Sequence, residues 1–502
     1  MSWRSLLDLV SAQPARFVAG FALAHVVVWT LAPVATHSAA PLDVIEGYAV
    51  GTEWVIGTYK HPALPSWLLQ ITRILTTGTT GWPAYLLSAL SIAATYGFVF
   101  LLGRDLMDER RAAAGTLLLS GIIYFNWVSP EFNHNVIQMP LWAGFAWALW
   151  RATDRPTMAR WLLVAVFAAA GMYGKLSTAL LLLAGGAWML TDERSRRLMR
   201  TPGPWLALAT FALLALPLAY WLVETNFLSL EYASRRALDG HASGVGAFVA
   251  KQLVSCLAAL ILLLASGLVS SPRPAARAAT THAAEGAAPI RDRRLRFLLM
   301  LLLVPLAVTI LSAAALGAGL KASWAAPMLN LIGLVAVALC SSRFDNAALQ
   351  RIAAGAMLLL PLIACAYVLN TAWLAPRFGE LQRVAWPQAQ IAKHFDELWR
   401  ARTGRPLRIV GGDPWVAGLI AAGLEHPPSV FFDADLEISP WITRQRLYDE
   451  GALIVWRHTT KSDPIEYQWL IGERVDGVEM IPMARPPRDG PLAISYAIVT
   501  PH

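Results

Sequence analysis

The sequence is poor in cysteine and in charge. Only three of its 502 residues are Cys, and Cys256, Cys340 and Cys365 each lie inside an apolar run without the spacing of metal ligands. They indicate small buried side chains and carry no inference about redox state. Charged residues make up 15% of the chain and hydrophobic residues 56%. A water-soluble fold of this length would leave much of that apolar surface exposed, so we predict a protein of the lipid bilayer.

The sequence also lacks the motifs of several other protein classes. It contains no G-x-x-x-x-G-K-[ST] and no H-E-x-x-H, which argues against a pump with its own nucleotide domain and against a zinc protease. Gly411-Gly412-Asp413 is too short for a nucleotide-binding loop and predicts a strand-to-helix turn capped by Asp413. The net charge of +8 comes from arginines spread between apolar segments. That pattern is typical of cytoplasmic loops, and we expect no nucleic-acid partner.

Apolar runs near the 20 residues that a membrane helix needs recur along the first 373 residues. Nine runs are clear: Phe17–Val34, Trp82–Leu102, Ala112–Val128, Val136–Trp150, Trp205–Val223, Phe248–Val269, Phe297–Leu316, Trp324–Cys340 and Ile352–Trp373. The segment Trp161–Leu190 is longer and is interrupted at Gly171–Lys175, which fits one tilted helix or a hairpin of two. No small-residue cleavage site follows the first run, so we expect it to remain as a membrane span.

The distribution of Lys and Arg decides between one helix and two in Trp161–Leu190. With two helices and a cytoplasmic amino terminus, the inward segments hold 20 of the 41 Lys and Arg residues, as the positive-inside rule requires. With one helix, the Arg-rich loops that follow would face outward. We therefore predict an α-helical polytopic protein with about eleven transmembrane helices, its amino terminus cytoplasmic.

The chain divides into a transmembrane domain, residues 1–373, and an extracytoplasmic α/β domain, residues 374–502. The first domain contains a large outward loop at 36–81 and a cytoplasmic linker at 271–296, whose low-complexity part at 271–288 we expect to be disordered. Periodicity in the second domain predicts helices and strands in this order: helix Gln388–Ala401, strand Leu407–Val410, helix Trp415–Leu424, and strands Ser429–Phe432, Ala452–Trp456, Gly477–Ile481 and Leu492–Val499.

Acidic side chains beside the membrane are costly and therefore mark candidate sites. Asp43 and Glu46 are three residues apart in the outward loop, on one face if Leu42–Val50 is helical. Paired acids suit a base that takes a proton from a hydroxyl while its neighbour orients it. A helix cap and a solvated helix face explain the same pair equally well.

A second outward loop, SPEFNHN at 129–135, is more polar than a connector between two spans requires. It carries Glu131, Asn133, His134 and Asn135 within seven residues. Asn and Ser are ordinary turn residues, but the density of polar groups favours substrate binding.

Cationic residues lie in three outward segments, each next to a membrane boundary. They are Lys60, His61, Lys175 and Lys321. The phosphate of a lipid carrier would lie at this depth, and such cations could bind it. Taken singly, each is explained as a side chain that reaches from a helix end to the interface. Their occurrence on one side of the membrane favours phosphate binding.

The chain resembles bacterial GT-C membrane glycosyltransferases of the family 39 type. This group is related to the dolichyl- or polyprenyl-phosphate-mannose protein mannosyltransferases and to the lipid A aminoarabinose transferase. Two motifs are fairly specific for one branch of the family, PLDVIEGYAVGTEWVIGTYKHPALPSWLL and SPEFNHNVIQMPLWA. GMYGKLSTALLLL, KASWAAPML, VGGDPWVAGLIAAGL and SVFFDADLEISPW are generic alone. The resemblance spans nearly the whole chain.

The resemblance implies transfer of a sugar from a polyprenyl-phosphate-sugar donor to an acceptor on the outer side of the membrane, usually with inversion. The acceptor stays open between lipid A or lipopolysaccharide core, another glycolipid and a protein. The family's first-loop acid is taken to be the catalytic base and falls here on Asp43 or Glu46. The family commonly has adjacent acids followed by Tyr, whereas Val44-Ile45 separate them here, so the assignment between the two also stays open.

We also expect Tyr59 to contact substrate. The residues that follow Tyr59 are the second departure from the family pattern. The aminoarabinose transferases have Glu-Lys-Pro-Pro where this chain has Lys60-His61-Pro62-Ala63. The identity of the sugar is therefore not carried over, and either Lys60 or His61 could meet the donor phosphate. We expect no separate activating cofactor. A divalent metal that bridges Asp43 or Glu46 to the phosphate has no ligand spacing to support it.

Two other classes of protein fit the composition. A transporter or flippase of a lipid-linked or small polar solute needs inverted repeats and charges at mid-membrane depth. We find no such repeat, and the charges gather at the outer interface. A non-catalytic assembly or sensory protein would use its soluble domain to bind a partner. The sequence favours the transferase over both.

Overall fold

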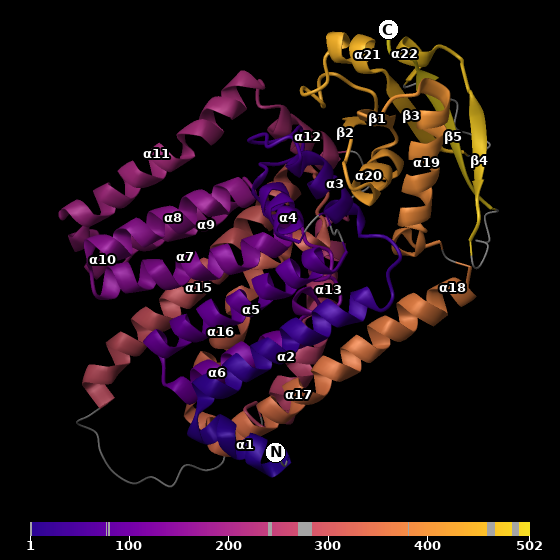
Figure 1. Ribbon diagram of the computed structural model, residues 1–502. Helices are drawn as coiled ribbons and strands as arrows, with labels where there is room; N and C mark the ends of the chain where they lie inside the picture. The colour runs from indigo at the N-terminus through magenta and orange to yellow at the C-terminus, as the bar shows by residue number, and fades with distance from the viewer. Residues whose placement is uncertain are drawn as a thin grey trace.

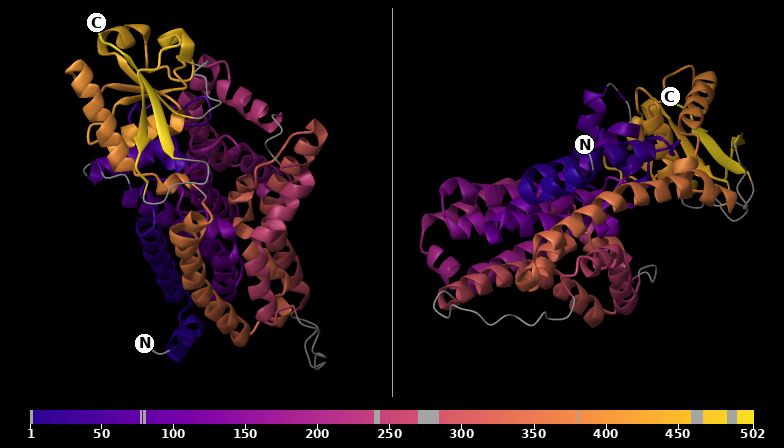
Figure 2. Two further views of the ribbon diagram at one scale, coloured as in Figure 1. Left: turned by 90° about the vertical axis from the view of Figure 1, so that its right-hand side faces the viewer. Right: turned by 90° about the horizontal axis from the view of Figure 1, so that it is seen from below.

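The computed structural model describes residues 3–76, 78, 81–238, 243–269, 284–379, 381–458, 467–483 and 491–502. It consists of a bundle of long helices and, beyond one end of the bundle, a domain built on a five-stranded sheet (Figure 1). The amino terminus lies at the end of the bundle away from the sheet, and the carboxy terminus lies in the sheet domain (Figure 2). The two predicted parts of the chain are therefore present.

Most of the helices outside the sheet domain follow the predicted apolar runs, whereas those at 3–12, 193–198, 228–238 and 375–377 were not predicted. Their bounds are α1 Trp3–Ala12, α2 Pro14–Val34, α5 Gly81–Leu106, α6 Glu109–Leu118, α7 His134–Asp154, α8 Met158–Gly174, α9 Thr178–Thr191, α10 Glu193–Leu198, α11 Pro202–Glu224, α12 Leu228–Leu238, α13 Val245–Ser255, α14 Leu257–Ala265, α15 Ala284–Leu316, α16 Ile332–Leu339, α17 Asn346–Leu369 and α18 Ala375–Arg377. Short 3₁₀ helices extend α6 towards Phe125 and precede α16 from Ala322.

The segment Trp161–Leu190 forms two helices, as the charge distribution predicts. Helix α8 ends at Gly174 and α9 begins at Thr178. Arg194, just after α9, donates a hydrogen bond at 3.2 Å to Asp154, which lies just before α8. Helix α9 therefore returns to the end of the bundle where α8 begins, and the hairpin is confirmed.

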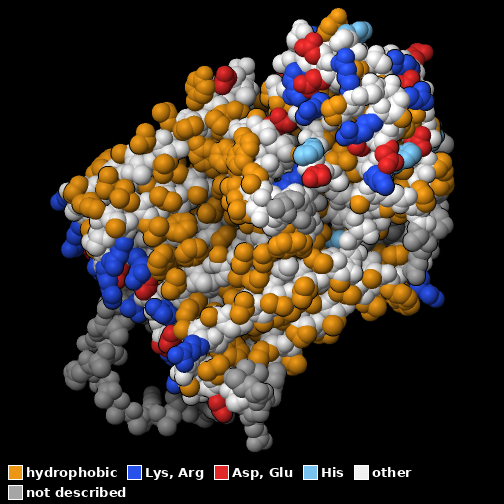
Figure 3. Space-filling model, in the orientation of Figure 1, with side chains coloured by type: hydrophobic (Ala, Val, Ile, Leu, Met, Phe, Trp, Pro, Cys, Tyr) orange, Lys and Arg blue, Asp and Glu red, His pale blue; other side chains and the backbone are white. Residues whose placement is uncertain are grey.

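The bundle has the apolar surface of a multi-pass membrane protein. Among the described residues, six helical stretches are long and apolar enough to cross a membrane: Pro14–Val34, Gly81–Leu106, Pro202–Glu224, Asp292–Leu316, Ala322–Leu339 and Asn346–Arg377. A seventh results if α13 and α14, bent by 45°, form one span. The other predicted spans fall on α6 to α9, which are shorter or less apolar and lie within the same bundle. Hydrophobic side chains cover its flank (Figure 3).

The loops predicted to face inward meet at the end of the bundle away from the sheet. Arg293 of α15 donates hydrogen bonds of 3.0 and 3.1 Å to Asp192, and Arg151 lies 3.3 Å from Asp105. The predicted alternation of loops between two ends is thus present in the bundle. We call this the paired end, because these cations have carboxylate partners.

The predicted linker at 271–296 differs from the structure in its second half. Helix α15 begins at Ala284, so residues 284–296 are helical. Their three Ala and four Arg residues favour a helix, although Gly286 and Pro289 do not, and they continue directly into an apolar span. Residues 271–283 lie outside the described part of the chain, where disorder stays a prediction.

The outward loop at 36–81 folds into two short helices, α3 Leu42–Gly51 and α4 Leu64–Leu75. The two pack so closely that a Cβ atom at Gly47 would lie 2.4 Å from Leu69 Cδ1. Glycine at this position lets α3 approach α4. The predicted helix at Leu42–Val50 is therefore confirmed, with most of its residues buried.

The soluble domain is a mixed sheet with helices. Its elements are α19 Gln388–Thr403, β1 Ile409–Gly412, α20 Pro414–Gly423, β2 Ser429–Phe432, α21 Arg444–Glu450, β3 Ala452–Arg457, α22 Gln468–Ile471, β4 Gly477–Ile481 and β5 Leu492–Val499. The strand order is β2-β1-β3-β5-β4, with the first three parallel and the last two antiparallel. Asp413 accepts a hydrogen bond of 2.9 Å from the Val416 N–H, which confirms the predicted helix cap.

The soluble domain is seated on the outward loop. The Val384 carbonyl accepts hydrogen bonds from the Ser38 and Ala39 N–H groups at 2.8 and 3.0 Å. Arg73 of α4 donates at 2.6 Å to the Leu424 carbonyl, just after α20. Because both ends of the loop are tied to this domain, α3 is held between the bundle and α20 (Figure 1).

Candidate active site

A cavity of about 740 Å³ lies at the end of the bundle next to the soluble domain. Every predicted site residue except Tyr59 lines it: Asp43, Glu46, Lys60, His61, Glu131, Asn133, His134, Asn135, Lys175 and Lys321. These residues come from four outward segments that are far apart in sequence. The structure brings them together, while their chemical roles stay predictions.

Asp43 faces the cavity from the first turn of α3 and is held by the loop at 129–135. The Asn133 amide donates a hydrogen bond of 2.9 Å to Asp43 Oδ2, and the Asp43 N–H donates one of 3.0 Å to Glu131 Oε1. Asn133 is itself fixed, because its side-chain oxygen caps α7 by accepting from the Asn135 and Val136 N–H groups. The neighbours of the Asp43 carboxylate thus come from this loop, whereas Glu46 was the predicted partner.

Glu131 forms a second acid beside Asp43. Burial and the nearby Asp43 carboxylate raise the pKa of Glu131 to about 7, although the Asp43 N–H and Arg383 favour its ionised form. At neutral pH Glu131 is therefore protonated in part of the population.

Glu46 is paired with Lys60. The Lys60 ammonium lies 2.8 and 3.0 Å from the two Glu46 oxygens. Burial by itself would lower the pKa of Lys60, but the Glu46 carboxylate raises it above its usual value. The turn after α3 causes this pairing, because Gly57 and Pro62 form an antiparallel bridge that brings Lys60 back over the helix.

Lys175 and Lys321 also line the cavity. Lys175, 8% exposed, donates a hydrogen bond of 2.7 Å to Asn135 Oδ1 and lies 5.6 Å from the Trp324 ring centre. Burial lowers its pKa to about 8, with Asp43 opposing the shift and Lys321 adding to it. Burial and the nearby Arg236 lower the pKa of Lys321 as well. Among the residues that the structure describes, neither lysine makes an ion pair with a carboxylate.

Two histidines lie against each other between these cations. The His61 and His134 ring centres are 4.3 Å apart, and His134 Nε2–H donates to the Pro62 carbonyl at 3.2 Å. Burial and then the neighbouring His134 and Lys175 lower the pKa of His61 well below its usual value. His61 is therefore neutral at physiological pH, so it can offer a hydrogen bond to a ligand but no charge.

Tyr59 does not line the cavity. Its ring packs edge-on against Tyr232 with 5.3 Å between ring centres, and Tyr232 is part of the cavity wall. Burial raises the pKa of Tyr59 to about 12. In this arrangement Tyr59 supports the wall from behind, which differs from the predicted substrate contact.

Sequence reasoning missed several residues of the wall: Tyr124, Tyr232, Arg236, Lys251 and Trp324. Lys251 falls inside the predicted apolar run Phe248–Val269, and an ionisable residue within such a run is a signal we could have used. Arg236 lies in an outward loop, where the positive-inside rule makes arginine unusual. The three aromatic residues carry no comparable signal.

The positive charge of the cavity comes from side chains. In the described ranges, no three His, Cys, Asp or Glu residues are grouped so that they could hold a metal ion. Lys175, Lys321, Arg236 and Lys251 all line the cavity. An anionic ligand is the partner that such a set of cations favours.

Comparison with known families gives a partial match. A model described as dolichyl-phosphate-mannose-protein mannosyltransferase matches residues 60–221. This range contains Lys60, His61, the loop at 129–135 and Lys175, but not α3. No curated protein sequence matches the chain.

Solved structures share the fold of nearly the whole chain. ArnT from Cupriavidus metallidurans bound to undecaprenyl phosphate is 14% identical with a TM-score of 0.63, and the match covers 96% of this chain and 98% of that one. Its apo form is 13% identical, with a TM-score of 0.60 and the same coverage. The arabinofuranosyltransferase AftD from Mycobacteria is 16% identical with a TM-score of 0.51, over 97% of this chain and 40% of that one. The chain therefore has the GT-C fold, related to that of ArnT.

Proposed function

We propose that the chain is a glycosyltransferase that moves a hexosyl or pentosyl group from a polyprenyl-phosphate donor to an acceptor on the outer side of the bacterial cytoplasmic membrane. One observation carries the proposal: a single cavity at the edge of the apolar bundle contains both a hydrogen-bonded carboxylate, Asp43, and cations that make no ion pair with the carboxylates that the structure describes. A phosphate leaving group needs the cations, and an acceptor hydroxyl needs the base. The structural match to ArnT bound to undecaprenyl phosphate supports a donor of this class.

The donor phosphate is assigned to the cations that lack an acidic partner. Lys175 and Lys321 lie at the ends of helices or their caps, beside Arg236 and Lys251 in the same wall. A phosphate bound there would separate cations that otherwise repel each other, and it would gain negative charge as the bond to the sugar breaks. Lys60 is a weaker candidate, because Glu46 already neutralises it.

Asp43 is assigned as the general base. Its carboxylate faces the cavity, Asn133 orients it, and Glu131 can carry the proton of the acid pair. In the proposed reaction the acceptor oxygen attacks the anomeric carbon on the face opposite the phosphate. The bond between that carbon and the phosphate oxygen breaks, and the hydroxyl proton passes to Asp43. Direct displacement of this kind inverts the anomeric configuration. Glu46 is the less favoured base, because it is bound to Lys60.

The proposed orientation places the amino terminus in the cytoplasm and the soluble domain in the periplasm. It rests on the arginines of the paired end, which the positive-inside rule assigns to the cytoplasm. A reporter fused after Ala372 checks it. Activity of a periplasmic reporter is expected, and a cytoplasmic signal would overturn both the orientation and the proposed side of the reaction.

The decisive experiment for the activity is transfer in detergent. Mass spectrometry of envelope lipids and proteins from cells with and without the chain first identifies the missing sugar and its acceptor. The purified chain is then expected to transfer that sugar from its labelled undecaprenyl-phosphate donor to the acceptor. A transporter or flippase is the alternative, and it would instead move solute only across sealed vesicles. Transport there without transfer in detergent would contradict the proposal.

A further inference from the structure

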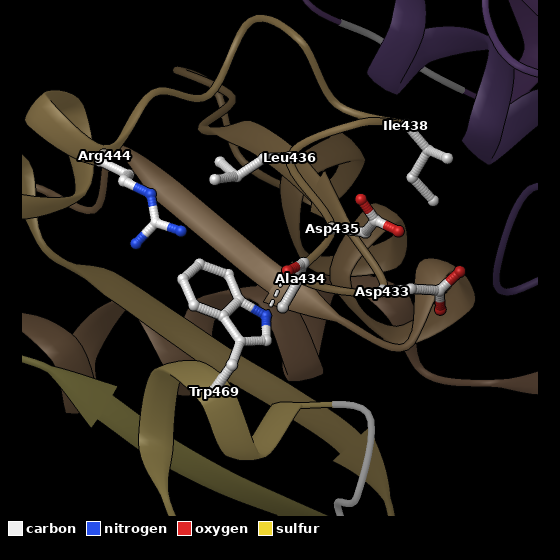
Figure 4. A pocket seen from close by; sticks show the side chains of 7 residues that line it. All are labelled: Asp433, Ala434, Asp435, Leu436, Ile438, Arg444 and Trp469. Carbon is white, nitrogen blue, oxygen red and sulfur yellow. Dashed lines mark hydrogen bonds between the residues drawn. The ribbon is translucent and has the colours of Figure 1, made fainter.

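A second cavity lies in the soluble domain and shares no lining residue with the candidate active site. Its volume is about 660 Å³, and its walls are formed by Asp433, Ala434, Asp435, Leu436, Ile438, Arg444 and Trp469 (Figure 4). It opens at the carboxyl end of β2, where the chain turns towards α21. We call it the β2 pocket. A volume of this size accommodates a small ligand of one or two rings.

The Trp469 ring forms the middle of the β2 pocket and is held in place. Its indole N–H donates a hydrogen bond of 3.0 Å to the Ala434 carbonyl, which fixes the plane of the ring. The side chain nevertheless stays 47% exposed. The Arg444 guanidinium lies 5.5 Å from the ring centre. A rigid, half-exposed aromatic surface is thus presented to a ligand.

The turn after β2 places two carboxylates beside that surface. Asp433 and Ala434 both have φ of 51°, a left-handed conformation that non-glycine residues rarely adopt. Hydrogen bonds from the Asp433 N–H to the Gly412 carbonyl and from the Asp435 N–H to the Phe432 carbonyl hold the turn. Figure 4 shows Asp433 and Asp435 on one side of the Trp469 ring and Arg444 on the other.

This combination of side chains matches the chemistry of a sugar ring. A pyranose presents C–H groups on its face, which pack on an aromatic ring, and hydroxyls around its edge. Carboxylate oxygens accept hydrogen bonds from those hydroxyls, and a guanidinium donates to them in a fixed planar geometry. Arg444 lines the pocket beside the Trp469 ring, where its guanidinium is placed to donate to a ligand.

The β2 pocket is close to the candidate active site. Tyr59 connects the two, because it packs against Tyr232 of the first cavity while its hydroxyl lies within the electrostatic influence of both Glu46 and Asp433. Lys60, which follows Tyr59, lines the first cavity. A ligand that occupies both cavities would have to extend past Tyr59 from one cavity to the other.

We infer that the β2 pocket binds a sugar unit of the acceptor, so that the acceptor is a saccharide-bearing molecule whose reacting hydroxyl lies in the first cavity. The inference rests on the proposed transferase function. It narrows the acceptor to a glycolipid or other glycan, and it gives the soluble domain the role of selecting it. A protein acceptor without sugar would leave the β2 pocket unused.

The test measures binding of an oligosaccharide to the full chain in detergent. The probe is the oligosaccharide released by mild acid from the envelope glycolipids of the cells that make the chain, followed by saturation-transfer NMR. Trp469→Ala and Arg444→Gln are each expected to weaken binding by about ten-fold or more, as loss of a central aromatic or Arg contact does. Tyr448→Ala is the matched control, because Tyr448 is an exposed aromatic residue of the same domain that lies outside the pocket.

Folding is controlled separately, since Trp469→Ala also removes the donor to Ala434. Arg444→Gln leaves that hydrogen bond intact, and loss of binding in both variants with unchanged melting temperatures supports the inference. If both variants bind the oligosaccharide as tightly as the wild type does, the inference is wrong. It is also wrong if the wild type binds unglycosylated peptides and does not bind the oligosaccharide.

The design separates this inference from the proposed function. Asp43→Asn is expected to bind the oligosaccharide as the wild type does while it loses transfer. If the wild type transfers sugar but Trp469→Ala and Arg444→Gln leave the acceptor KM unchanged, the β2 pocket assignment is wrong and the transferase stands. If the wild type transfers nothing yet binds the oligosaccharide through Trp469, the transferase is wrong and the saccharide site stands.

Discussion

The two ends of the helix bundle use charge in opposite ways. At the paired end, Arg293 meets Asp192, and Arg194 meets Asp154. At the end beneath the soluble domain, Lys175 and Lys321 make no ion pair with a carboxylate of any residue that the structure describes, and Asp43 lies beside a second acid. Paired charges fix helix ends and leave little capacity for a ligand. Lys175 is buried, and an anionic ligand can compensate for the solvation that its ammonium has lost.

The residue types at the two ends follow the same division. The cations of the paired end are arginines, whose planar group bonds two carboxylate oxygens at once, as Arg293 does with Asp192. Besides Lys60, the cavity is lined by one arginine, Arg236, and by three lysines, Lys175, Lys251 and Lys321. A lysine ammonium is compact, and burial shifts its pKa more readily than that of arginine. The difference indicates structural contacts at one end and ligand contacts at the other.

The largest expected effect is on the chemical step. Asp43→Asn keeps the size of the side chain but removes the base, so transfer in a single turnover is expected to slow by about 10²–10⁴-fold. Asp192→Asn at the paired end is expected to leave that rate unchanged while it lowers the free energy of unfolding by about 1.5–3 kcal/mol. Rapid-quench kinetics and thermal unfolding measure the two quantities.

Glu46→Gln is the control for the assignment of the base. A loss in Glu46→Gln as large as that in Asp43→Asn would leave the two acids unresolved, and wild-type turnover by Asp43→Asn would exclude its role.

The next effect is on donor affinity. Lys175→Met removes a buried cation while it retains an unbranched apolar side chain, and it is expected to weaken undecaprenyl phosphate binding by about 10–100-fold, the effect of one charged hydrogen bond. Arg194→Met, at the paired end, is expected to change nothing. Equal affinity of Lys175→Met and wild type, measured by isothermal titration in detergent, would remove Lys175 from the phosphate site.

A pH effect of about ten-fold should accompany this. The pKa of Lys175, lowered to about 8 by burial, means that the ammonium is present below pH 8 and is lost as the pH rises through that value. Affinity for undecaprenyl phosphate is therefore expected to fall by about ten-fold between about pH 7 and pH 9. The phosphate itself titrates near this range, so the informative quantity is the difference from Lys175→Met, whose affinity should lack the decline.

The smallest effect concerns the ion pair between Lys60 and Glu46. Because Glu46 already neutralises Lys60, Lys60→Met should weaken donor binding less than Lys175→Met does. A double-mutant cycle with Lys60→Met and Glu46→Gln is expected to show a coupling energy of about 0.5–3 kcal/mol in unfolding. Two results together would contradict this: additive effects of the two substitutions on stability, and a loss of donor affinity in Lys60→Met as large as that in Lys175→Met. Lys60 would then be assigned to the phosphate site.

Much of the bundle could be predicted from the sequence. Long apolar runs indicate membrane helices, and the distribution of arginine among the loops indicates which way each helix runs. The break at Lys175 required only charge counting, and its consequence, a common end for Asp43, Glu131, Lys175 and Lys321, is present in the structure. The strands of the soluble domain were visible in their β-branched and aromatic residues. Short helices such as α21 were not predicted, because a helix of two turns without an apolar face shows no hydrophobic periodicity in the sequence.

The pairing inside the cavity could not be predicted, because it depends on contacts distant in sequence. Asp43 and Glu46 share a helix face, but their partners are set by the 129–135 loop and by the turn that returns Lys60. Lys251 is an exception, because its charge inside an apolar run was a signal that we did not use. Trp469 and Asp433 of the β2 pocket meet only because the sheet places the end of β2 beside α22, and no local pattern records such a juxtaposition.

The most direct test of this contrast is to locate the donor lipid. Undecaprenyl phosphate that carries a photoreactive group next to its phosphate is bound to the full chain in detergent, cross-linked by light and mapped by mass spectrometry. The account predicts labelled peptides that contain Lys175, Lys321 or Trp324, and it predicts loss of that labelling in Lys175→Met. Labelling confined to the paired end, around Asp192 and Arg293, would contradict it.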